Sequence, residues 1–279
     1  MHVYLNGDFL DAAVARVSVD DRGFLFADGV YEVIRVIDGR VFLAQPHLRR
    51  LRDGLDALRI DQPRVDFADI ADRLLRENRL DDGEAIVYIQ VTRGVAPRKH
   101  AFPPPDVPAT AYVAARPLAP HSADAFERGV GAITVPDTRW SRCDIKSVSL
   151  LPNVLANQQA KEAGAFEALF VRDGALIEGS HANLFGVLGG ELRTYPACNY
   201  ILAGITRSLV LEIARDEGIP VREAPIYWED RGDLEELFLS GTTTDVMPIT
   251  RLDDTAIAGG QPGPVTRRLL HALRERMRA

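Results

Sequence analysis

Hydrophobic and polar positions along the first part of the chain predict mainly β-hairpins. Short apolar segments flank Asn6-Gly7, and a second pair flanks Asp38-Gly39. Asn-Gly tolerates the positive φ angles of a tight turn, so the first pair predicts a two-stranded hairpin. Apolar runs at residues 85–92 and 110–115 predict buried strands. We therefore expect antiparallel-rich sheets.

Helical spacing of apolar residues is the second pattern. Leu48, Leu51, Leu55 and Leu58 recur on one face of a helix that begins near Pro46. The same reasoning predicts further helices at residues 67–75, at 153–163, from Gly204-Ile205-Thr206 onward, and at 265–277. Hairpins mixed with helices predict an α+β fold.

Proline-rich stretches interrupt this pattern at residues 102–108 and 116–121. The first is long enough to be a functional loop, and the second is the best linker candidate. We expect a smaller N-terminal domain at 1–118, a linker at 119–122 and a larger C-terminal domain at 123–279. A length of 279 residues agrees with roughly two domains.

Charge and composition exclude several classes of protein. The chain has 33 basic and 40 acidic residues, a net charge of −7, which argues against a general nucleic-acid binder or a basic membrane-surface protein. No apolar run approaches the length of a membrane span, and no signal peptide is recognised. The two cysteines, Cys143 and Cys198, do not form a disulfide framework, so we expect a cytoplasmic protein.

Common catalytic and binding motifs are missing from the sequence. The six histidines show no metal-ligand spacing, so we expect no metal site. The glycine-rich dinucleotide and phosphate loops and the GxSxG nucleophile motif are also absent. Cysteine nucleophile chemistry is open to Cys143, although a small buried cysteine is the more common case.

Lysine is scarce in this chain, which narrows the search for amine chemistry. Only Lys99, Lys146 and Lys161 carry a primary amine among the 33 basic side chains. Lys146 lies in an apolar-flanked stretch, where burial favours the neutral amine that attacks a carbonyl to form a Schiff base. The alternative is a lysine whose stem packs while its ammonium reaches water.

Three further segments carry groups that suit a cofactor with both a protonated ring nitrogen and an anionic group. Glu178 is expected at a strand end, either as a solvated turn residue or as the counter-ion of a protonated ring nitrogen. The start of a helix at Gly204-Ile205-Thr206 offers amides and a hydroxyl to an anion. The hydroxyl-rich run 240–244 follows a strand and offers a second cradle. Each of these is also compatible with an ordinary cap or turn.

Taken together and in order, these segments resemble the fold type IV transaminases that use pyridoxal 5′-phosphate, and among them the D-amino-acid transaminases. The resemblance covers nearly the whole chain and rests on DRGFLFADGVYEV (21–33), VTRGVAPRKHAFP (91–103), RWSRCDIKS (139–147), EGSHANLFG (178–186), GITR (204–207) and SGTTTD (240–245). It implies a two-domain fold with antiparallel-rich sheets and flanking helices.

The resemblance also implies the cofactor contacts. Lys146 would form the Schiff base with the cofactor and carry the proton between the substrate Cα and the cofactor. Glu178 would pair with the pyridine nitrogen and keep it protonated, which makes the ring an electron sink. The phosphate would be bound by Arg50, Ile205, Thr206, Gly241 and Thr242.

For the substrate, the resemblance implies a trap for the α-carboxylate made of Tyr31, Arg98 and His100. In the D-amino-acid enzymes the arginine and histidine come from the neighbouring subunit, which implies a homodimer. This sequence departs from those enzymes after the Glu-Gly pair, where Ser180 is followed by His181 in place of a further serine. We expect Ser180 and His181 to affect substrate specificity or cofactor hydrogen bonding.

The expected reaction is reversible transamination between a D-amino acid of the D-alanine or D-glutamate type and 2-oxoglutarate or pyruvate. Alternatives with the same fold and cofactor are a branched-chain L-amino-acid transaminase, an (R)-selective amine transaminase and an aminodeoxychorismate lyase. A cofactor-free binding or scaffold protein, in which Lys146 merely packs, is the alternative from another class. No nucleic-acid or membrane partner is expected.

Overall fold

The structure is a computed structural model that describes residues 1–279, apart from the side chain of Ala258. Contacts divide the chain into two units. The first consists of Met1–Ala119 and Ile145–Ser149, and the second of Pro120–Asp144 and Leu150–Ala279. The segment 145–149, which the sequence analysis places in the C-terminal domain, thus belongs with the N-terminal residues.

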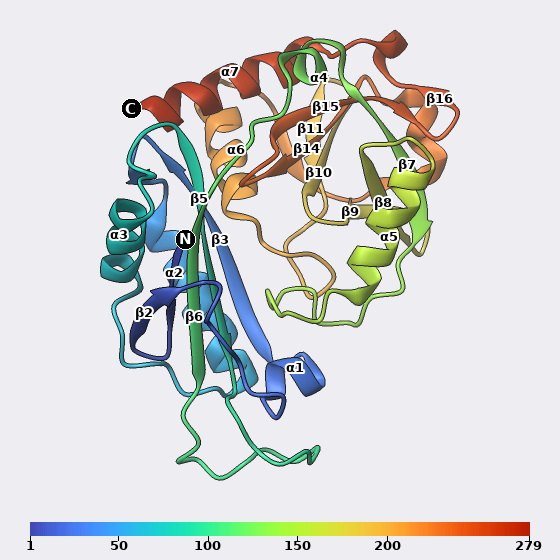
Figure 1. Ribbon diagram of the computed structural model, residues 1–279. Coiled ribbons are helices and arrows are strands. Elements are labelled where there is room, and N and C mark those ends of the chain that lie inside the picture. Colours follow the sequence, from blue (N-terminus) through green and yellow to red (C-terminus); the bar gives the residue numbers. More distant parts are fainter. The chain divides into compact units, whose positions relative to one another are not determined.

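In its described residues the first unit contains one antiparallel sheet with the strand order β2-β1-β6-β5-β3-β4 (Figure 1). Positive φ angles at Asn6 (51°) and Gly7 (108°) form the predicted turn between the first two strands. The elements of this unit are β1 (His2–Leu5), β2 (Asp8–Asp11), α1 (Arg22–Phe26), β3 (Gly29–Ile37), β4 (Arg40–Val41), α2 (Ala44–Leu58), α3 (Phe67–Glu77), β5 (Glu84–Thr92) and β6 (Thr110–Pro117).

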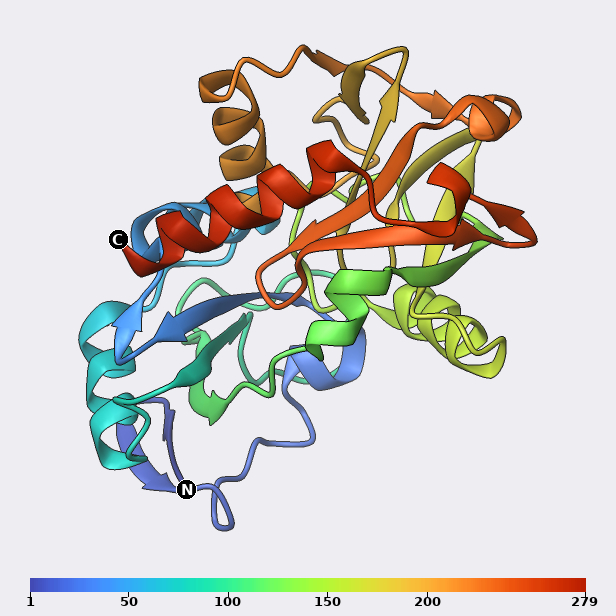
Figure 2. The ribbon, with the colours of Figure 1, turned by 90° about the horizontal axis from the view of Figure 1, so that it is seen from above.

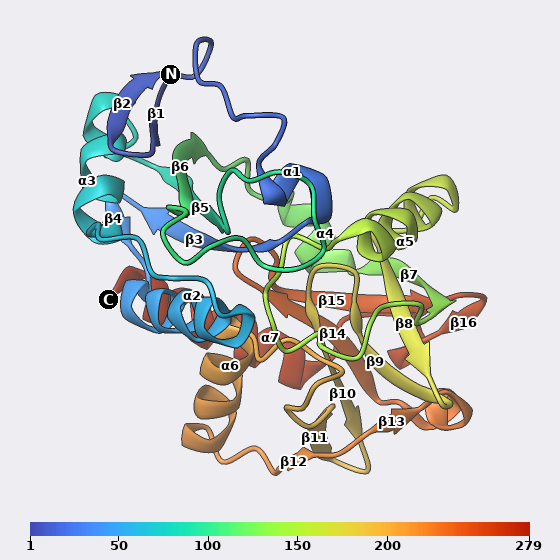
Figure 3. The same ribbon diagram turned by 90° about the horizontal axis from the view of Figure 1, so that it is seen from below.

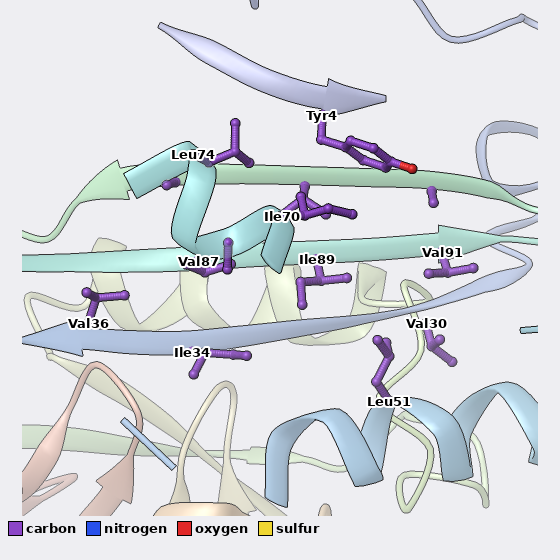
Figure 4. Packing of buried hydrophobic residues seen from close by; sticks show 14 of the residues in the cluster. Tyr4, Val30, Ile34, Val36, Leu51, Ile70, Leu74, Val87, Ile89 and Val91 are labelled. Atoms are coloured by element: carbon purple, nitrogen blue, oxygen red, sulfur yellow. The ribbon is translucent and has the colours of Figure 1, made fainter. Parts of the chain in front are cut away.

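Two helices share one hydrophobic core with this sheet. Val30 and Ile34 of β3 and Ile89 of β5 pack in one cluster with Leu51 of α2 and Leu74 of α3 (Figure 4). Figure 3 shows α2 and α3 beside the strands that they cover. Because side chains alternate along a strand, residue 32 shares the face of Val30 and Ile34, and residue 31 faces the other way.

The segment 145–149 pairs with the outer edge of β3. The amide of Tyr31 donates to the carbonyl of Lys146 at 3.0 Å, and the amide of Val148 donates to the carbonyl of Gly29 at 3.1 Å. Ile145 is buried in the core of the first unit. Backbone pairing thus fixes the position of Lys146 along β3, next to Tyr31.

In its described residues the second unit contains a sheet that runs β12-β11-β10-β14-β15-β7-β8-β9-β13, with β16 beside β15. The pairs β15–β7, β7–β8 and β11–β12 are parallel, and the others are antiparallel. The strands are β7 (Val130–Pro136), β8 (Glu167–Arg172), β9 (Ala175–Gly179), β10 (Asn183–Leu188), β11 (Glu191–Thr194), β12 (Val221–Glu223), β13 (Ile226–Tyr227), β14 (Glu236–Gly241), β15 (Asp245–Leu252) and β16 (Thr255–Ala256).

One pairing closes part of this sheet on itself. The path from β10 through β14, β15, β7 and β8 reaches β9, and β9 returns to β10 through the pair Glu178–Asn183. A predicted functional residue therefore lies at the point of closure.

Helices cover the second sheet. Small residues such as Ala156 and Ala160 bring α5 close to the strands, where they pack with Phe170 of β8. Figure 2 shows α7 lying along β14 and β15 with α6 beside it. The helices are α4 (Ala123–Arg128), α5 (Leu151–Glu162), α6 (Ile205–Asp216) and α7 (Pro264–Arg278), with short 3₁₀ turns η1 (Trp228–Asp233) and η2 (Ala258–Gly260).

In the described part of the chain, no helix combines the length and the apolar character that a membrane crossing needs.

The buried core should respond to truncation more strongly than exposed apolar positions do. Leu74 is 0% exposed within the first core, so Leu74→Ala should lower the free energy of unfolding by about 2–5 kcal/mol. Leu151 on α5 is 69% exposed, and the control Leu151→Ala should change it by less than about 0.5 kcal/mol. Urea unfolding measures both values, and equal losses would contradict the assignment of the core.

Candidate active site

Lys146 is held against an aromatic ring of the first unit. It is half-buried between the buried residues Ile145 and Ser147. Its Nζ lies 4.3 Å from the centroid of the Tyr31 ring, and that ring stacks on Tyr88 with 5.8 Å between centroids. Burial raises the pKa of Tyr88 to about 12, so its hydroxyl stays neutral. The amine is thus positioned by backbone pairing on one side and by a tyrosine ring on the other.

A buried carboxylate network lies on the opposite face of β3, where α2 packs. Glu32 is fully buried and accepts hydrogen bonds from Nε (2.6 Å) and Nη2 (2.8 Å) of Arg50. Nδ1 of His47 lies 2.8 Å from the second oxygen of the same carboxylate. Arg50 is therefore oriented by a bidentate pair with Glu32. Neither Glu32, although it lies in the motif 21–33, nor His47 was predicted as a site residue.

The charge state of this network follows from its contacts. Burial favours a protonated Glu32, but the hydrogen bonds from Arg50 and His47 outweigh it and lower the pKa of Glu32 to about 2. Burial also lowers the pKa of His47 below its ordinary value, although Glu32 acts in the opposite direction. At neutral pH an ionised Glu32 thus accepts from a charged arginine and a neutral histidine, which fixes Arg50 beneath the strand that carries Tyr31.

The remaining members of the predicted carboxylate trap lie in the loop between β5 and β6. Arg98 and His100 are exposed, and both contact Phe26 of α1, with 5.1 Å and 5.5 Å to the ring centroid. Tyr31 instead packs with Tyr88 and Lys146. The three predicted residues thus belong to two separate aromatic clusters of the first unit.

Glu178 lies at the end of β9 in the second unit, buried among polar partners. One carboxylate oxygen accepts from Nη1 of Arg139 at 2.5 Å, and the other accepts from Nδ2 of Asn183 at 3.0 Å and from the amide of Leu202 at 3.3 Å. Arg139 also forks onto Asp137, at 2.9 and 3.0 Å, and its guanidinium lies over the ring of Phe170. Arg139 lies in the motif 139–147, but its contact with Glu178 was not predicted from the sequence.

Burial determines the protonation of this carboxyl group. It raises the pKa of Glu178 to about 7, even though Arg139 acts to lower it. The pKa of Asp137 is instead held below its ordinary range, because its hydrogen bonds from Arg139 outweigh its own burial. A carboxyl group with a pKa near neutrality readily shares a proton with a nearby nitrogen base, which is the role predicted for Glu178.

Asn183 joins the predicted cofactor motifs of the second unit. Its amide donates to Glu178 and to the carbonyl of Leu202 (2.8 Å), and in the β10–β14 ladder it pairs with Ser240. A Cβ at Gly204 would lie 2.0 Å from Oδ1 of Asn183, so a larger residue at the start of α6 would displace the Asn183 amide from its hydrogen bonds. One side chain thus brings the Glu178 turn, the GITR segment and the hydroxyl-rich run to the same end of the sheet.

The site offers unpaired donors to an anion. Gly204 caps α6 without a side-chain hydrogen bond, so the first-turn amides at residues 205–207 point away from the helix without intrahelical partners. Within the described residues, the buried hydroxyls Oγ of Ser240 and Oγ1 of Thr244 have no hydrogen-bond partner. Such orphaned donors fit a phosphate group. The predicted contacts at Gly241 and Thr242 lie half-buried between the two hydroxyls.

The turn that follows Glu178 contains the sequence departure noted above. Oγ of Ser180 donates to the fully buried Glu167 at 2.5 Å, and Nδ1 of the exposed His181 lies 2.7 Å from the other oxygen of that carboxylate. Burial acts to raise the pKa of Glu167, but the bonds from His181 and Ser180 outweigh it and hold the pKa below its ordinary value. Histidine at position 181 therefore supplies a partner for a buried charge.

The structure thus distributes the predicted residues over both units. Tyr31, Arg50, Arg98, His100 and Lys146 belong to the first, and Glu178, Ser180, His181, Ile205, Thr206, Gly241 and Thr242 belong to the second. Cys143 is buried, and burial raises the pKa of its thiol to about 11, which disfavours its use as a nucleophile.

Comparison with known proteins identifies the family. The profile of the class IV amino-transferases matches residues 29–252, which is most of the chain. The chain belongs to this family. It is 39% identical over 269 residues to a D-alanine aminotransferase of Staphylococcus haemolyticus, covering 96% of this chain and 94% of that protein. It is 37% identical to a D-alanine aminotransferase of Bacillus licheniformis, covering 98% and 96%.

Solved structures give the same fold. The branched-chain amino acid aminotransferase of Escherichia coli superimposes with a TM-score of 0.89 at 26% identity, covering 98% of this chain and 93% of that one. The branched-chain enzyme of Thermoproteus uzoniensis gives 0.85 at 28% identity, covering 99% and 94%. The predicted fold class, the aminotransferase activity and the pyridoxal-phosphate cofactor of the family are therefore confirmed.

The raised pKa of Glu178 predicts a pH dependence in the cofactor-free protein. Between its ordinary value of 4.5 and about 7, the unfolded chain loses this proton while the folded chain keeps it. The contribution of Glu178 to the free energy of unfolding is therefore fully present below pH 4.5 and is lost as the pH rises through about 7. The unfolding free energy of wild type minus that of Glu178→Gln should fall by about 1–3 kcal/mol from pH 5 to pH 7.5.

Urea titrations at the two pH values measure this difference. The matched control is Glu162→Gln on α5, where the carboxylate is exposed and no such trend is expected. A difference for Glu178→Gln that does not change with pH would contradict the assignment.

Proposed function

We propose that this chain is a homodimeric D-amino-acid transaminase that moves an amino group between a D-amino acid of the D-alanine or D-glutamate type and 2-oxoglutarate or pyruvate. The main observation in support of this proposal is the set of groups that lie around Asn183. A buried carboxyl with a pKa near neutrality, a helix start and two orphaned hydroxyls there suit a phosphorylated pyridine.

Each of these groups has a separate task toward pyridoxal 5′-phosphate. Glu178 would share a proton with the pyridine nitrogen, while Arg139 and Asn183 hold the two carboxylate oxygens of Glu178 in place. The amides of Ile205 and Thr206, with the hydroxyl-rich run 240–244, would hold the phosphate, and Arg50 would contribute a positive charge. Once bound, the cofactor supplies an electron sink for the pair left when the Cα proton is removed.

The first unit supplies the base and the groups that orient it. The amine of Lys146 would remove the proton from the substrate Cα and deliver the same proton to the cofactor. Its backbone is tied to β3, and its Nζ lies against the ring of Tyr31. Tyr31 is in turn fixed by Tyr88, so the position of the amine does not depend on a mobile side chain alone.

The α-carboxylate of the substrate is proposed to bind Arg98 and His100. Charge-assisted bonds to a carboxylate suit both residue types. Within one copy these side chains pack on Phe26 and not with Tyr31, which supports their delivery by the neighbouring subunit. A dimer with shared sites follows, and each copy completes the substrate pocket of the other.

The D-amino-acid assignment is favoured over the alternatives by the relatives. Those at 37–39% identity are D-alanine aminotransferases by name, whereas the branched-chain enzymes with similar structures are 26–28% identical. The pair Arg98 and His100 also argues against an (R)-selective amine transaminase, whose substrates lack a carboxylate.

A cytoplasmic location is proposed from the thiols. Cys143 and Cys198 are both free in the structure, which suits a reducing compartment.

Donor selectivity tests the proposed reaction. Purified protein loaded with pyridoxal 5′-phosphate should transfer an amino group to 2-oxoglutarate from D-alanine, and far more slowly from L-leucine or (R)-1-phenylethylamine. The physical reason is that donors of the wrong hand, or without a carboxylate, do not present the Cα proton to Lys146. Formation of glutamate, measured with each donor, decides the matter. Transfer from L-leucine but not from D-alanine would contradict the D-amino-acid assignment.

Hybrid dimers test the shared site. Lys146→Ala should be inactive, and Arg98→Ala should raise the KM for D-alanine roughly ten- to hundredfold, as expected for a lost charge-assisted bond. In a hybrid of the two variants, one site regains Lys146 from one copy and Arg98 from the other. At a D-alanine concentration that leaves each variant nearly inactive, a re-equilibrated mixture should recover roughly a quarter of wild-type activity, because half of the dimers are hybrids with one intact site.

Each variant treated alone is the control for this mixing. Lys99→Ala, which alters the exposed neighbour of Arg98, should leave the KM for D-alanine close to that of the wild type. Absence of recovery in a mixture whose hybrids are verified by mass would show that Arg98 serves its own copy.

A further inference from the structure

The loop at residues 93–109 is tied down on one side although its charged tip is exposed. The amide of Arg22 donates to the carbonyl of Gly94 at 2.9 Å, and the amide of Ala96 donates to the carbonyl of Asp20 at 3.2 Å. Gly94 has a φ of 92°, and a Cβ there would lie 2.0 Å from the carbonyl oxygen of Pro108. The two ends of the loop are therefore close together, and its start is bound to the segment that leads into α1.

A buried arginine binds the backbone at the tip of this loop, while Arg59 and Arg93 pack over the ring of Phe102 further along it. The side chain of Arg22 is nearly fully buried, and its Nε donates to Asp28 at 2.8 Å. Its Nη1 donates to the carbonyl of Lys99 at 2.6 Å and lies 3.4 Å from that of Ala101. These two carbonyls flank His100, and Arg98 precedes Lys99. The guanidinium thus binds the backbone on both sides of His100, next to Arg98, the other residue of the proposed carboxylate trap.

Asp28 links this arginine to the body of the first unit. The same oxygen that accepts from Arg22 accepts from Nε of Arg93 at 2.8 Å, and the other oxygen accepts from its Nη2 at 3.0 Å. Burial acts to raise the pKa of Asp28, but the two arginines outweigh it and hold the pKa below its ordinary value. Arg93 also donates to the carbonyls of Leu58 and Arg59 at the end of α2. The loop anchor therefore ends on a helix of the core.

The side chains of Arg98 and His100 pack on Phe26, the same ring on which Arg22 packs. The guanidinium carbon of Arg22 lies 4.8 Å from the centroid of the Phe26 ring, and that of Arg98 lies 5.1 Å from it. The His100 ring contacts Phe26 as well, with 5.5 Å between centroids. Arg22 thus binds the backbone of the loop tip and packs on the ring that supports its two functional side chains.

We propose that Arg22 is a positioning residue, which preorganises Arg98 and His100 to receive the α-carboxylate of the substrate. This inference rests on the proposed function, because it takes Arg98 and His100 to be the trap. A loop that is already ordered loses little further conformational entropy when the substrate binds, so the substrate binds more tightly. Arginine is required because one planar fork reaches Asp28 and a carbonyl together, which a lysine ammonium on a single stem does not reproduce.

The test compares Arg22→Met and Arg22→Lys with Arg16→Met as the matched control, each in the cofactor-loaded enzyme. Arg16 lies in the same segment, is exposed and donates only to the nearby carbonyls of Ala13 and Ala15. Arg22→Met should raise the KM for D-alanine about tenfold with kcat within about twofold of wild type. The KM of Arg22→Lys should lie between those of the wild type and Arg22→Met, and the KM of Arg16→Met should match that of the wild type.

A second readout does not depend on activity. Trypsin cleaves after arginine and lysine, so the bonds that follow Arg98 and Lys99 report on the order of the loop tip. Brief digestion followed by mass measurement should show faster cleavage at these bonds in Arg22→Met than in wild type or Arg16→Met. A fold that is lost altogether would instead cleave at many sites and lose the colour of the bound cofactor.

The outcomes separate this inference from the proposed function. If Arg98→Ala raises the KM but Arg22→Met does not, the positioning role of Arg22 is overturned and the trap stands. Unchanged cleavage after Arg98 and Lys99 in Arg22→Met overturns the anchor directly. If Arg98→Ala leaves the KM unchanged, the proposed trap fails, and the role given to Arg22 fails with it.

Discussion

The contact on which the second unit depends is the pair formed by Glu178 and Asn183. It is the point where β9 meets β10 and closes a run of strands on itself, and it also connects the carboxylate to the start of α6. Closing a sheet removes an edge, so the same bond serves the fold and the site. Gly204 lies against the Asn183 amide, so the start of α6 is positioned by the same residue that donates to Glu178.

Buried carboxylates paired with arginine recur throughout the molecule. Glu32 is bound by Arg50, Asp28 by two arginines, and Asp137 and Glu178 share Arg139. A buried charge without a partner is costly, and the planar fork of arginine satisfies both oxygens of a carboxylate at once. The outcome differs with geometry, since Glu32 stays ionised whereas burial raises the pKa of Glu178 toward neutrality. The surroundings thus decide the role of each carboxyl group: Glu32 stays charged and orients Arg50, whereas the pKa of Glu178 suits the sharing of a proton.

Sequence patterns predicted the long elements well and the short ones poorly. The hairpin turns and the amphipathic helices α2 and α3 carry strong local signals, and the structure has them where the patterns indicate. The helix α1, with five residues, was not predicted, because it is too short to show a helical period. The parallel pairs β15–β7 and β7–β8 were not foreseen either, since local periodicity does not reveal which strands become neighbours.

By itself, the sequence determined the family and the cofactor class, because these depend on residue types in a fixed order, and it predicted Lys146 as the reactive lysine. Only the tertiary structure showed that segment 145–149 pairs with β3, that Glu32 and His47 lie behind Tyr31, and that Asn183 joins three motifs. Those relations depend on contacts between residues far apart in the chain. A buried Glu within an apolar strand looks like an exposed one until the helix that covers it is in place.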